Sequence, residues 1–74
     1  MILNLNDVSI GQTATIYKLN STGNIRRRLL DIGLVDNTKI KCIGKNASGN
    51  MKAFLIRGAV IAIRTDDLKN ILIK

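Results

Sequence analysis

The side chains best suited to chemistry in this sequence are three consecutive arginines, Arg26, Arg27 and Arg28, and a single cysteine, Cys42. The chain has no histidine and no glutamate. Without histidine, a Ser/His or Cys/His nucleophilic device has no base, so we expect no catalytic residue and no enzyme. An internal disulfide and a zinc site built from cysteine and histidine are excluded by the same inventory.

Carboxylates that could hold a metal are also scarce. The acidic side chains are five aspartates: Asp7, Asp31, Asp36, Asp66 and Asp67. The adjacent pair Asp66 and Asp67 suits the N-terminus of a helical turn, which favours negative charge. Cys42 falls on the inward face of a predicted strand, where a thiol behaves as a small hydrophobe. We therefore expect no metal site and no bound cofactor.

The arginine cluster lies in the first turn of a helix predicted over residues 25–32, where positive charge opposes the helix dipole. Two structural roles compete with partner recognition. Arg27 and Asp31 can pair at i,i+4. Arg28, one position from the apolar stripe, can pack its stem on the strands and pair with an aspartate there. Arg26 and Arg27 point away from the stripe and are the candidates for recognition.

The helix is indicated by apolar residues at positions 25, 29 and 32, with polar residues on the opposite side. Asn24 is the expected N-cap, with Thr22 as its rival. Gly33 stands where a left-handed residue ends a helix. A second, single helical or 3-10 turn is expected over residues 65–68.

Short strands must position these residues. Glycines divide the chain into segments rich in β-branched residues, which favour strands. Five strands are predicted: Thr13–Leu19, Lys39–Ile43, Met51–Arg57, Ala59–Arg64 and Asn70–Ile73. Residues 45–51 are predicted to form a flexible hairpin loop. Five short strands with one inserted helix indicate a mainly β fold, a closed or nearly closed barrel in a single domain over residues 1–74.

Alternation along the strands predicts which residues face the interior. The inward set is Ala14, Ile16, Ile40, Cys42, Phe54, Ile56, Ile61, Ile63, Ile71 and Ile73. Residues 53–63 alternate poorly, so a shift by one residue is the competing assignment there. The apolar residues assigned outward are Tyr17, Leu55, Val60 and Leu72. If they form one exposed patch, that patch marks a partner surface.

Charge and composition narrow the choice of partner. Twelve lysines and arginines against five aspartates give a formal net charge of +7, which suits nucleic acid. Binders of single strands also need stacking aromatics, and Tyr17 and Phe54 are the only aromatic residues. Binding through phosphate contacts alone remains the alternative function, weak and steeply salt-dependent. No apolar run approaches the about 20 residues of a membrane span, and the N-terminus lacks a basic signal region, so we expect a cytoplasmic protein.

Several motifs together resemble a known family. Residues 28–34, with the sequence RLLDIGL, are followed by Val35-Asp36-Asn37-Thr38 and the strand 39–43. The second half adds the motifs IRG at 56–58, IAIR at 61–64 and ILI at 71–73. In order and spacing this pattern resembles the ferrous iron transport protein A (FeoA) family over nearly the whole chain.

The sequence departs from the family pattern in three places. Asp36-Asn37 replaces a Pro-Gly turn; if the turn is type II, its third position needs positive φ, and asparagine is the best substitute for glycine there. Leu68 stands where alanine is usual, and the region of Met51 lacks a proline.

The resemblance implies an SH3-like barrel and a cytosolic, non-enzymatic accessory of the membrane ferrous-iron transporter FeoB. Similar barrels occur in metal-dependent repressors of the diphtheria toxin repressor type, but no DNA-reading helix-turn-helix precedes the barrel here, so we do not expect a repressor. We expect docking through an apolar patch with a basic rim: Tyr17, Leu55 and Val60 with Arg26, Arg27 and Arg57. Self-association through the same patch is a third possibility.

Overall fold

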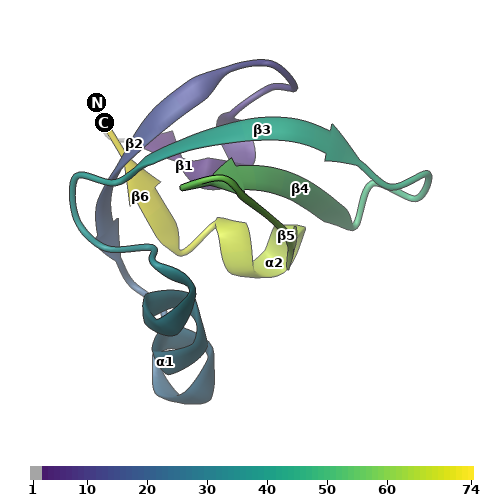
Figure 1. The fold of residues 1–74 in the computed structure, drawn as a ribbon. Coiled ribbons are helices and arrows are strands. Elements are labelled where there is room, and N and C mark those ends of the chain that lie inside the picture. Colours follow the sequence, from purple (N-terminus) through teal and green to yellow (C-terminus); the bar gives the residue numbers. More distant parts are fainter. Residues whose placement is uncertain (1–2) are drawn as a thin grey trace.

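The computed structural model describes residues 3–74 and contains six strands, two helices and one 3-10 turn (Figure 1). The strands are β1 (Leu3–Asn4), β2 (Thr13–Leu19), β3 (Lys39–Lys45), β4 (Met51–Ile56), β5 (Ala59–Arg64) and β6 (Ile71–Ile73). The remaining elements are η1 (Leu5–Asp7), α1 (Gly23–Ile32) and α2 (Thr65–Leu68). The expected mainly β fold is confirmed, with one strand more than predicted.

All strand pairs are antiparallel, and the sheet order is β1-β6-β2-β3-β4-β5. Strand β2 serves both halves of the sheet, because residues 13–15 pair with β3 and residues 16–19 pair with β6. A register shift between Ile16 and Lys18 marks the change of partner. The sheet curls around its own interior (Figure 1), while α2 contacts both β5 and η1 and covers the opening between the two sheet ends.

The interior of the barrel is aliphatic around one aromatic ring. Phe54 is completely buried and lies among leucines and isoleucines. The inward assignments made from alternation are correct, with Ile61 half-buried at the margin of the core. Residues 53–63, which alternate poorly, therefore face as predicted and are not shifted by one residue. Of the apolar residues assigned outward, Tyr17, Leu55 and Val60 are exposed and Leu72 is half-buried.

The N-terminal segment was missed because it is too short to show periodicity. Strand β1 has two residues and pairs with β6, and η1 follows it directly. A capping box stabilises η1: the Asn4 side chain accepts a hydrogen bond from the Asn6 N–H at 3.0 Å, and the Asn4 N–H donates to Asp7. Asp7 is therefore a capping residue.

Helix α1 begins two residues earlier than predicted. Its N-cap is Thr22, so the assignment to Asn24 is wrong and the rival is correct. The Thr22 side chain makes no capping hydrogen bond. Gly33 has φ 112°, as expected, and the N–H groups of Gly33 and Leu34 donate to the carbonyls of Leu30 and Leu29, both at 3.0 Å. These paired bonds form a Schellman motif, which ends the helix.

The turns explain two further differences. Asn37 has φ 70°, which bears out the expectation that asparagine takes a position needing positive φ. Strand β4 ends at Ile56 rather than at Arg57, because Arg57 and Gly58 both have positive φ and form the two-residue turn of the β4–β5 hairpin. The turn at 65–68 forms where it was predicted, as one turn of α-helix.

Candidate interaction surface

The six residues expected to bind a partner lie on four different parts of the molecule. Leu55 and Val60 lie on the outer side of β4 and β5, and Tyr17 lies on β2. Arg26 and Arg27 belong to α1, and Arg57 belongs to the β4–β5 turn. Figure 1 shows that α1 projects from the barrel, so its residues are set apart from the sheet.

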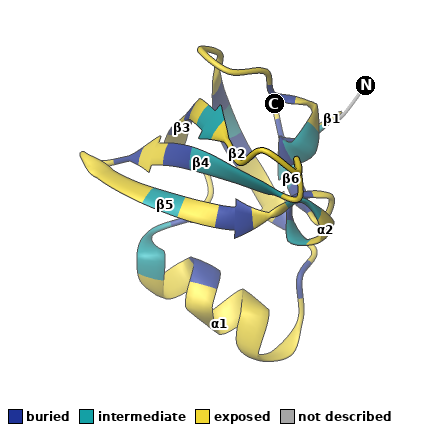
Figure 2. Cartoon of the chain, turned by 90° about the vertical axis from the view of Figure 1, so that its right-hand side faces the viewer, coloured by how far each residue is buried: buried dark blue, intermediate teal, exposed yellow. Residues whose placement is uncertain are grey.

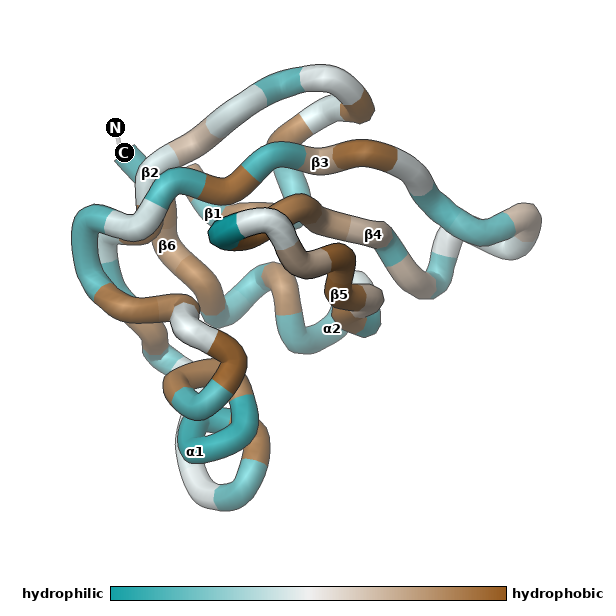
Figure 3. Tube along the Cα trace, viewed as in Figure 1, coloured by the Kyte–Doolittle hydropathy of each residue, from teal (hydrophilic) through white to brown (hydrophobic). Residues whose placement is uncertain are grey.

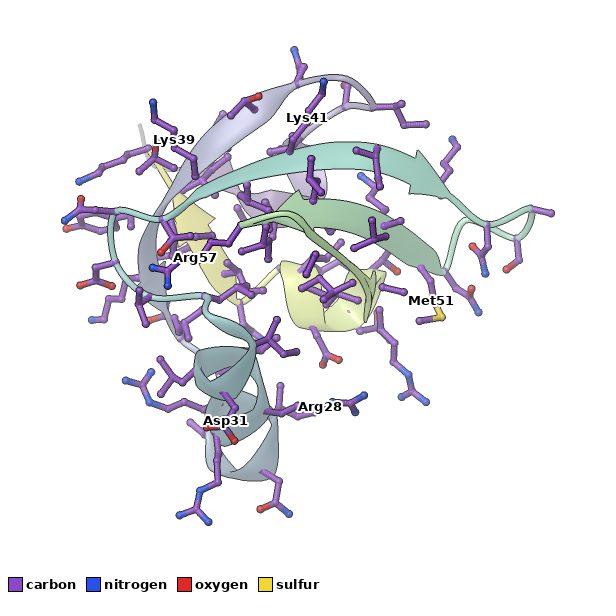
Figure 4. The ribbon with its side chains drawn as sticks, in the orientation of Figure 1. Arg28, Asp31, Lys39, Lys41, Met51 and Arg57 are labelled. Carbon is purple, nitrogen blue, oxygen red and sulfur yellow. The ribbon has the colours of Figure 1, made fainter. Side chains whose placement is uncertain are left out.

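The outer side of β3, β4 and β5 carries a compact apolar patch, which we call the sheet face. Leu55 pairs directly with Val60 on one side and with Lys41 on the other. Their exposed fractions are 38 % for Leu55 and 63 % for Val60, and Ile43 on β3 adds a third exposed apolar side chain at 40 %. Figure 3 shows hydrophobic residues along β4 and β5, and Figure 4 shows Lys39 and Lys41 on β3 beside them.

Ile43 was not among the expected residues. Strict alternation from the inward-facing Ile40 and Cys42 assigns it outward, so the signal was present in the sequence. A register shift between Cys42 and Gly44 follows in the pairing with β4.

Tyr17 lies in a different surface feature, a hollow of about 660 Å³ between β2 and α1, which we call the helix groove. Its exposed apolar side chains include Leu30 and Val35. Arg26 also lines the groove, and its Nη1 donates a hydrogen bond to the Leu19 carbonyl at 2.9 Å. Arg26 therefore reaches back to the end of β2, a contact that its expected position away from the apolar stripe did not predict.

Arg27 and Arg28 line two different hollows beside α1. Arg27 lines a shallow hollow with Gly23 and Asp31, whereas Arg28 lines a groove shared with β5 and α2. Figure 4 shows Arg28 running away from α1 toward the side of the barrel that carries α2 and Met51. Neither arginine forms an ion pair within the described residues 3–74. The two expected structural pairings, Arg27 with Asp31 and Arg28 with an aspartate on the strands, therefore do not form.

Arg57 connects the barrel to the helix. A Cβ placed on Gly33 would lie 3.9 Å from Arg57 Cδ, so the arginine side chain packs against the C-terminal end of α1. Figure 4 shows it between the end of β4 and the segment that leads from α1 to β3. A cation at the C-terminus of a helix is stabilised by the helix dipole.

The structure thus brings four of the six expected residues together in two pairs rather than all six in one patch. Leu55 and Val60 share the sheet face, and Tyr17 and Arg26 share the helix groove. Leu55 is two strands away from Thr13, and Tyr17 lies four residues further along β2. Strand spacings put these steps at about 10 Å and about 13 Å, which separates the two surfaces.

Two lysines that contribute to the net charge are held by contacts with distant parts of the chain. Lys52 Nζ donates to the carbonyl of Asn6 at 2.7 Å and to that of Val8 at 3.4 Å, which ties β4 to the segment around η1. Lys74 Nζ donates to the Asn37 side chain at 2.7 Å and lies 6.0 Å from the centre of the Tyr17 ring. The sequence contains no pattern that would single out these contacts, because they join residues far apart in the chain.

The surface offers side chains for binding a partner rather than a cluster of metal ligands within the described residues. Within residues 3–74 no group of three or more aspartate, glutamate, histidine or cysteine side chains gathers to hold a metal ion. Cys42 is fully buried, and its Sγ lies 3.9 Å from the Gly44 carbonyl oxygen. The described part of the chain also contains no helix with the length and apolar character needed to cross a bilayer. The sheet face presents exposed apolar side chains, such as Leu55 and Val60, next to basic residues such as Lys41.

Comparison with known proteins finds the same fold in solved structures of FeoA proteins. The family model described as the FeoA domain matches residues 3–74. The FeoA-like protein from Clostridium acetobutylicum is 29% identical, with a TM-score of 0.88 over 99% of this chain and 85% of that chain. The zinc complex of Stenotrophomonas maltophilia FeoA, described as a prokaryotic SH3 domain protein, is 17% identical, with a TM-score of 0.86 over 97% of this chain and 89% of that chain.

A manganese-dependent transcriptional repressor, in complex with manganese, has the same fold in part of its length. It is 16% identical, with a TM-score of 0.87 over 99% of this chain but 36% of that chain. At this identity the likeness concerns the fold alone. No curated protein sequence matches the chain. The expected SH3-like barrel is confirmed.

Proposed function

The chain belongs to the FeoA family, and we propose that it serves ferrous iron uptake as a cytosolic, non-enzymatic accessory that binds the membrane transporter FeoB. The sheet face is the surface we assign to this contact. The observation that supports it is the direct pairing of Leu55 with Val60, both exposed, on the outer side of a sheet whose interior is already filled.

The composition of the sheet face suits a protein partner. Well-packed interfaces have an apolar centre, which loses its water on binding, and a polar rim. Here Leu55, Val60 and Ile43 supply the centre, and Lys41 stands in the same cross-strand row. Arg57, at the turn beyond Leu55, adds a second cation at the margin. The basic rim favours an acidic surface on the transporter.

The helix groove is the second element of the expected interface. Tyr17 and Arg26 lie there together, and Arg27 lies on the neighbouring side of α1. A transporter surface that contacted all six residues would have to extend from the sheet face across Arg57, which packs against the C-terminal end of α1, to the helix groove. Variants of the two surfaces therefore show whether one or both take part.

The test is binding of the purified protein to detergent-solubilised FeoB in the nucleotide-free, GDP-bound and GTP-analogue-bound states. We expect Val60→Asp to weaken binding at least about tenfold, since it places a charge at the apolar centre. Leu3→Asp is the matched control, because Leu3 is an exposed apolar residue on β1, at the opposite end of the sheet order. Absence of binding in all three states contradicts the proposal.

Tyr17→Ala tests the helix groove in the same assay. A loss comparable to that of Val60→Asp would extend the interface around the molecule, and an unchanged affinity would confine it to the sheet face. Circular dichroism of each variant confirms that the fold is retained. Tight DNA binding at an ionic strength of about 0.15 M would instead favour the nucleic-acid alternative, since binding through phosphate contacts weakens steeply with salt.

A further inference from the structure

Strand β5 has one free side. It stands at the end of the sheet, with β4 as its single neighbour in the sheet order. Figure 2 shows β5 at the front of the molecule, with its free side turned toward α1. Strand β1, at the other end of the sheet, has only two residues, whereas β5 has six. Of the two edges, β5 is therefore the one long enough to pair with another strand.

The hairpin geometry shows which backbone groups face this free side. In a two-residue hairpin the pair that flanks the turn, here Ile56 and Ala59, exchanges hydrogen bonds, and every second pair does the same. The Thr65 N–H donates to the Asn50 carbonyl at 3.0 Å, in keeping with this alternation. Ala59, Ile61 and Ile63 thus bond to β4.

The intervening residues direct their backbone groups outward. Val60 and Ala62 present both N–H and C=O to the free side, and Arg64 presents its N–H. None of these groups has a partner among the turn, loop and side-chain hydrogen bonds of residues 3–74. The edge is a row of unpaired donors and acceptors, which is the arrangement to which an added strand binds.

A groove of about 360 Å³ runs between this edge and α1. Its apolar lining comes from both sides: Ile25, Leu29, Ile32, Met51, Ala62 and Ile63. An added strand directs alternate side chains to one face, so such a groove can receive every second side chain of a peptide on β5. The backbone edge and the apolar groove therefore suit the same ligand.

The charge of the groove determines the kind of strand. Arg28 and Arg64 both line it, against a single carboxylate from Asp67. Neither arginine has an ion-pair partner within residues 3–74, and the whole chain carries a formal charge of +7. Guanidinium groups bind carboxylates with two parallel hydrogen bonds. The complementary strand is one that carries acidic residues.

We propose that the β5 edge binds an extended acidic segment of another protein as an additional strand, with its apolar side chains in the groove beside α1. This inference goes beyond the proposed function, since it concerns another surface and the chemistry of any such segment. A second copy of the chain is a poorer occupant. It would bring a further charge of +7 and place Arg64 of each β5 along the shared edge.

The test uses a synthetic peptide of about nine residues that alternates valine with glutamate, and a counterpart that alternates valine with lysine. The ¹⁵N-labelled protein is titrated with each. We expect the acidic peptide to slow hydrogen exchange at the Val60 and Ala62 amides at least about tenfold and the lysine peptide to leave exchange unchanged.

Variants distinguish strand pairing at the β5 edge from nonspecific electrostatic attraction between an acidic peptide and a basic protein. Arg28→Glu should weaken binding at least about tenfold, whereas Arg27→Glu makes the same charge change in a different hollow of α1 and should stay within about twofold. Ala62→Pro removes an outward N–H without removing a bond to β4 and should abolish binding. If that variant does not fold, Arg64→Glu takes its place.

Three results would overturn the proposal. The first is equal binding of the acidic and lysine peptides, and the second is protection of amides on β3 and β4 with none at Val60 and Ala62. The third is concentration-dependent protection of Val60 and Ala62 without peptide, which would show that a second copy occupies the edge.

Discussion

The barrel and α1 are stabilised to very different degrees. Inward-facing side chains of the barrel strands are buried, whereas α1 buries one of its ten residues, Leu29. The helix is held to the barrel by a few contacts: the burial of Leu29, the Arg26 bond to Leu19, and the packing of Arg57 on Gly33. Regions with few buried contacts open first, so we expect α1 to open more readily than the sheet.

This difference matters for binding because both proposed surfaces depend on the barrel. The sheet face lies entirely on strands, and the β5 edge borrows only one wall of its groove from α1. The strands thus supply a rigid platform, while the helix can adjust to a ligand. The following changes test how far the two regions are independent, beginning with the largest expected effect.

Phe54→Ala should destabilise the whole domain. Phe54 is fully buried at the centre of the core, and truncation of a buried phenylalanine costs about 3–5 kcal/mol. That is a large part of the about 5–15 kcal/mol typical of folded domains. Urea denaturation followed by circular dichroism measures the loss. Leu55→Ala, at the neighbouring exposed position, should cost less than about 1 kcal/mol, and equal losses would show that the face assignment is wrong.

Leu29→Ala should detach α1 and leave the barrel folded. It removes the single buried side chain of the helix, at a cost of about 2–3 kcal/mol. Hydrogen exchange should show faster exchange of the α1 amides, with those of β3 and β4 keeping their protection. Uniform loss of protection across both regions would show that helix and barrel form one cooperative unit.

Gly33→Ala should cost about 1–2 kcal/mol through backbone strain. Its φ of 112° disfavours a side chain, while the nearest atom, Arg57 Cδ, lies at an ordinary contact distance of 3.9 Å. Gly44→Ala is the matched control, because Gly44 has no positive φ and no atom within 4 Å of the added Cβ. Thermal denaturation should show a lower melting temperature for Gly33→Ala than for Gly44→Ala. A larger decrease for Gly44→Ala would contradict the explanation by backbone strain.

Thr22→Asp should stabilise α1 by about 0.5–1 kcal/mol. Thr22 makes no capping bond, and the first turn of the helix has no acidic residue. An aspartate would accept a backbone hydrogen bond and offset the charge of the arginines that follow. Thr22→Asn, without the charge, separates the two contributions. No change in melting temperature for either variant would mean that the helix terminus does not limit stability.

Local sequence patterns predicted most of the strands and the interior. Alternation identified Ile40, Cys42, Phe54 and Ile63 as inward residues because one face of each strand must be buried. The patterns could not reveal β1, whose two residues carry no periodicity, or Arg57 in the turn, because positive φ is uncommon for arginine.

The sequence predicted which single residues of the candidate surface are exposed, but it did not predict which of them lie next to one another. Exposure of Tyr17, Leu55 and Val60 followed from strand alternation, yet their separation into two surfaces depends on β2 changing its partner from β3 to β6. The role of Arg26 was missed, since its contact with Leu19 spans a loop and the entry angle of α1 decides it.

The amino-acid sequence by itself determined the kind of protein this is: a basic, aliphatic β domain, with the motifs of the FeoA family and without the histidine that a Ser/His or Cys/His pair needs. These properties follow from composition and local periodicity, which do not depend on long-range contacts. Only the tertiary structure decided that β5 ends the sheet beside α1, with outer backbone groups that have no partner within residues 3–74. Strand order is set by contacts between residues far apart in the chain, and no local pattern encodes it.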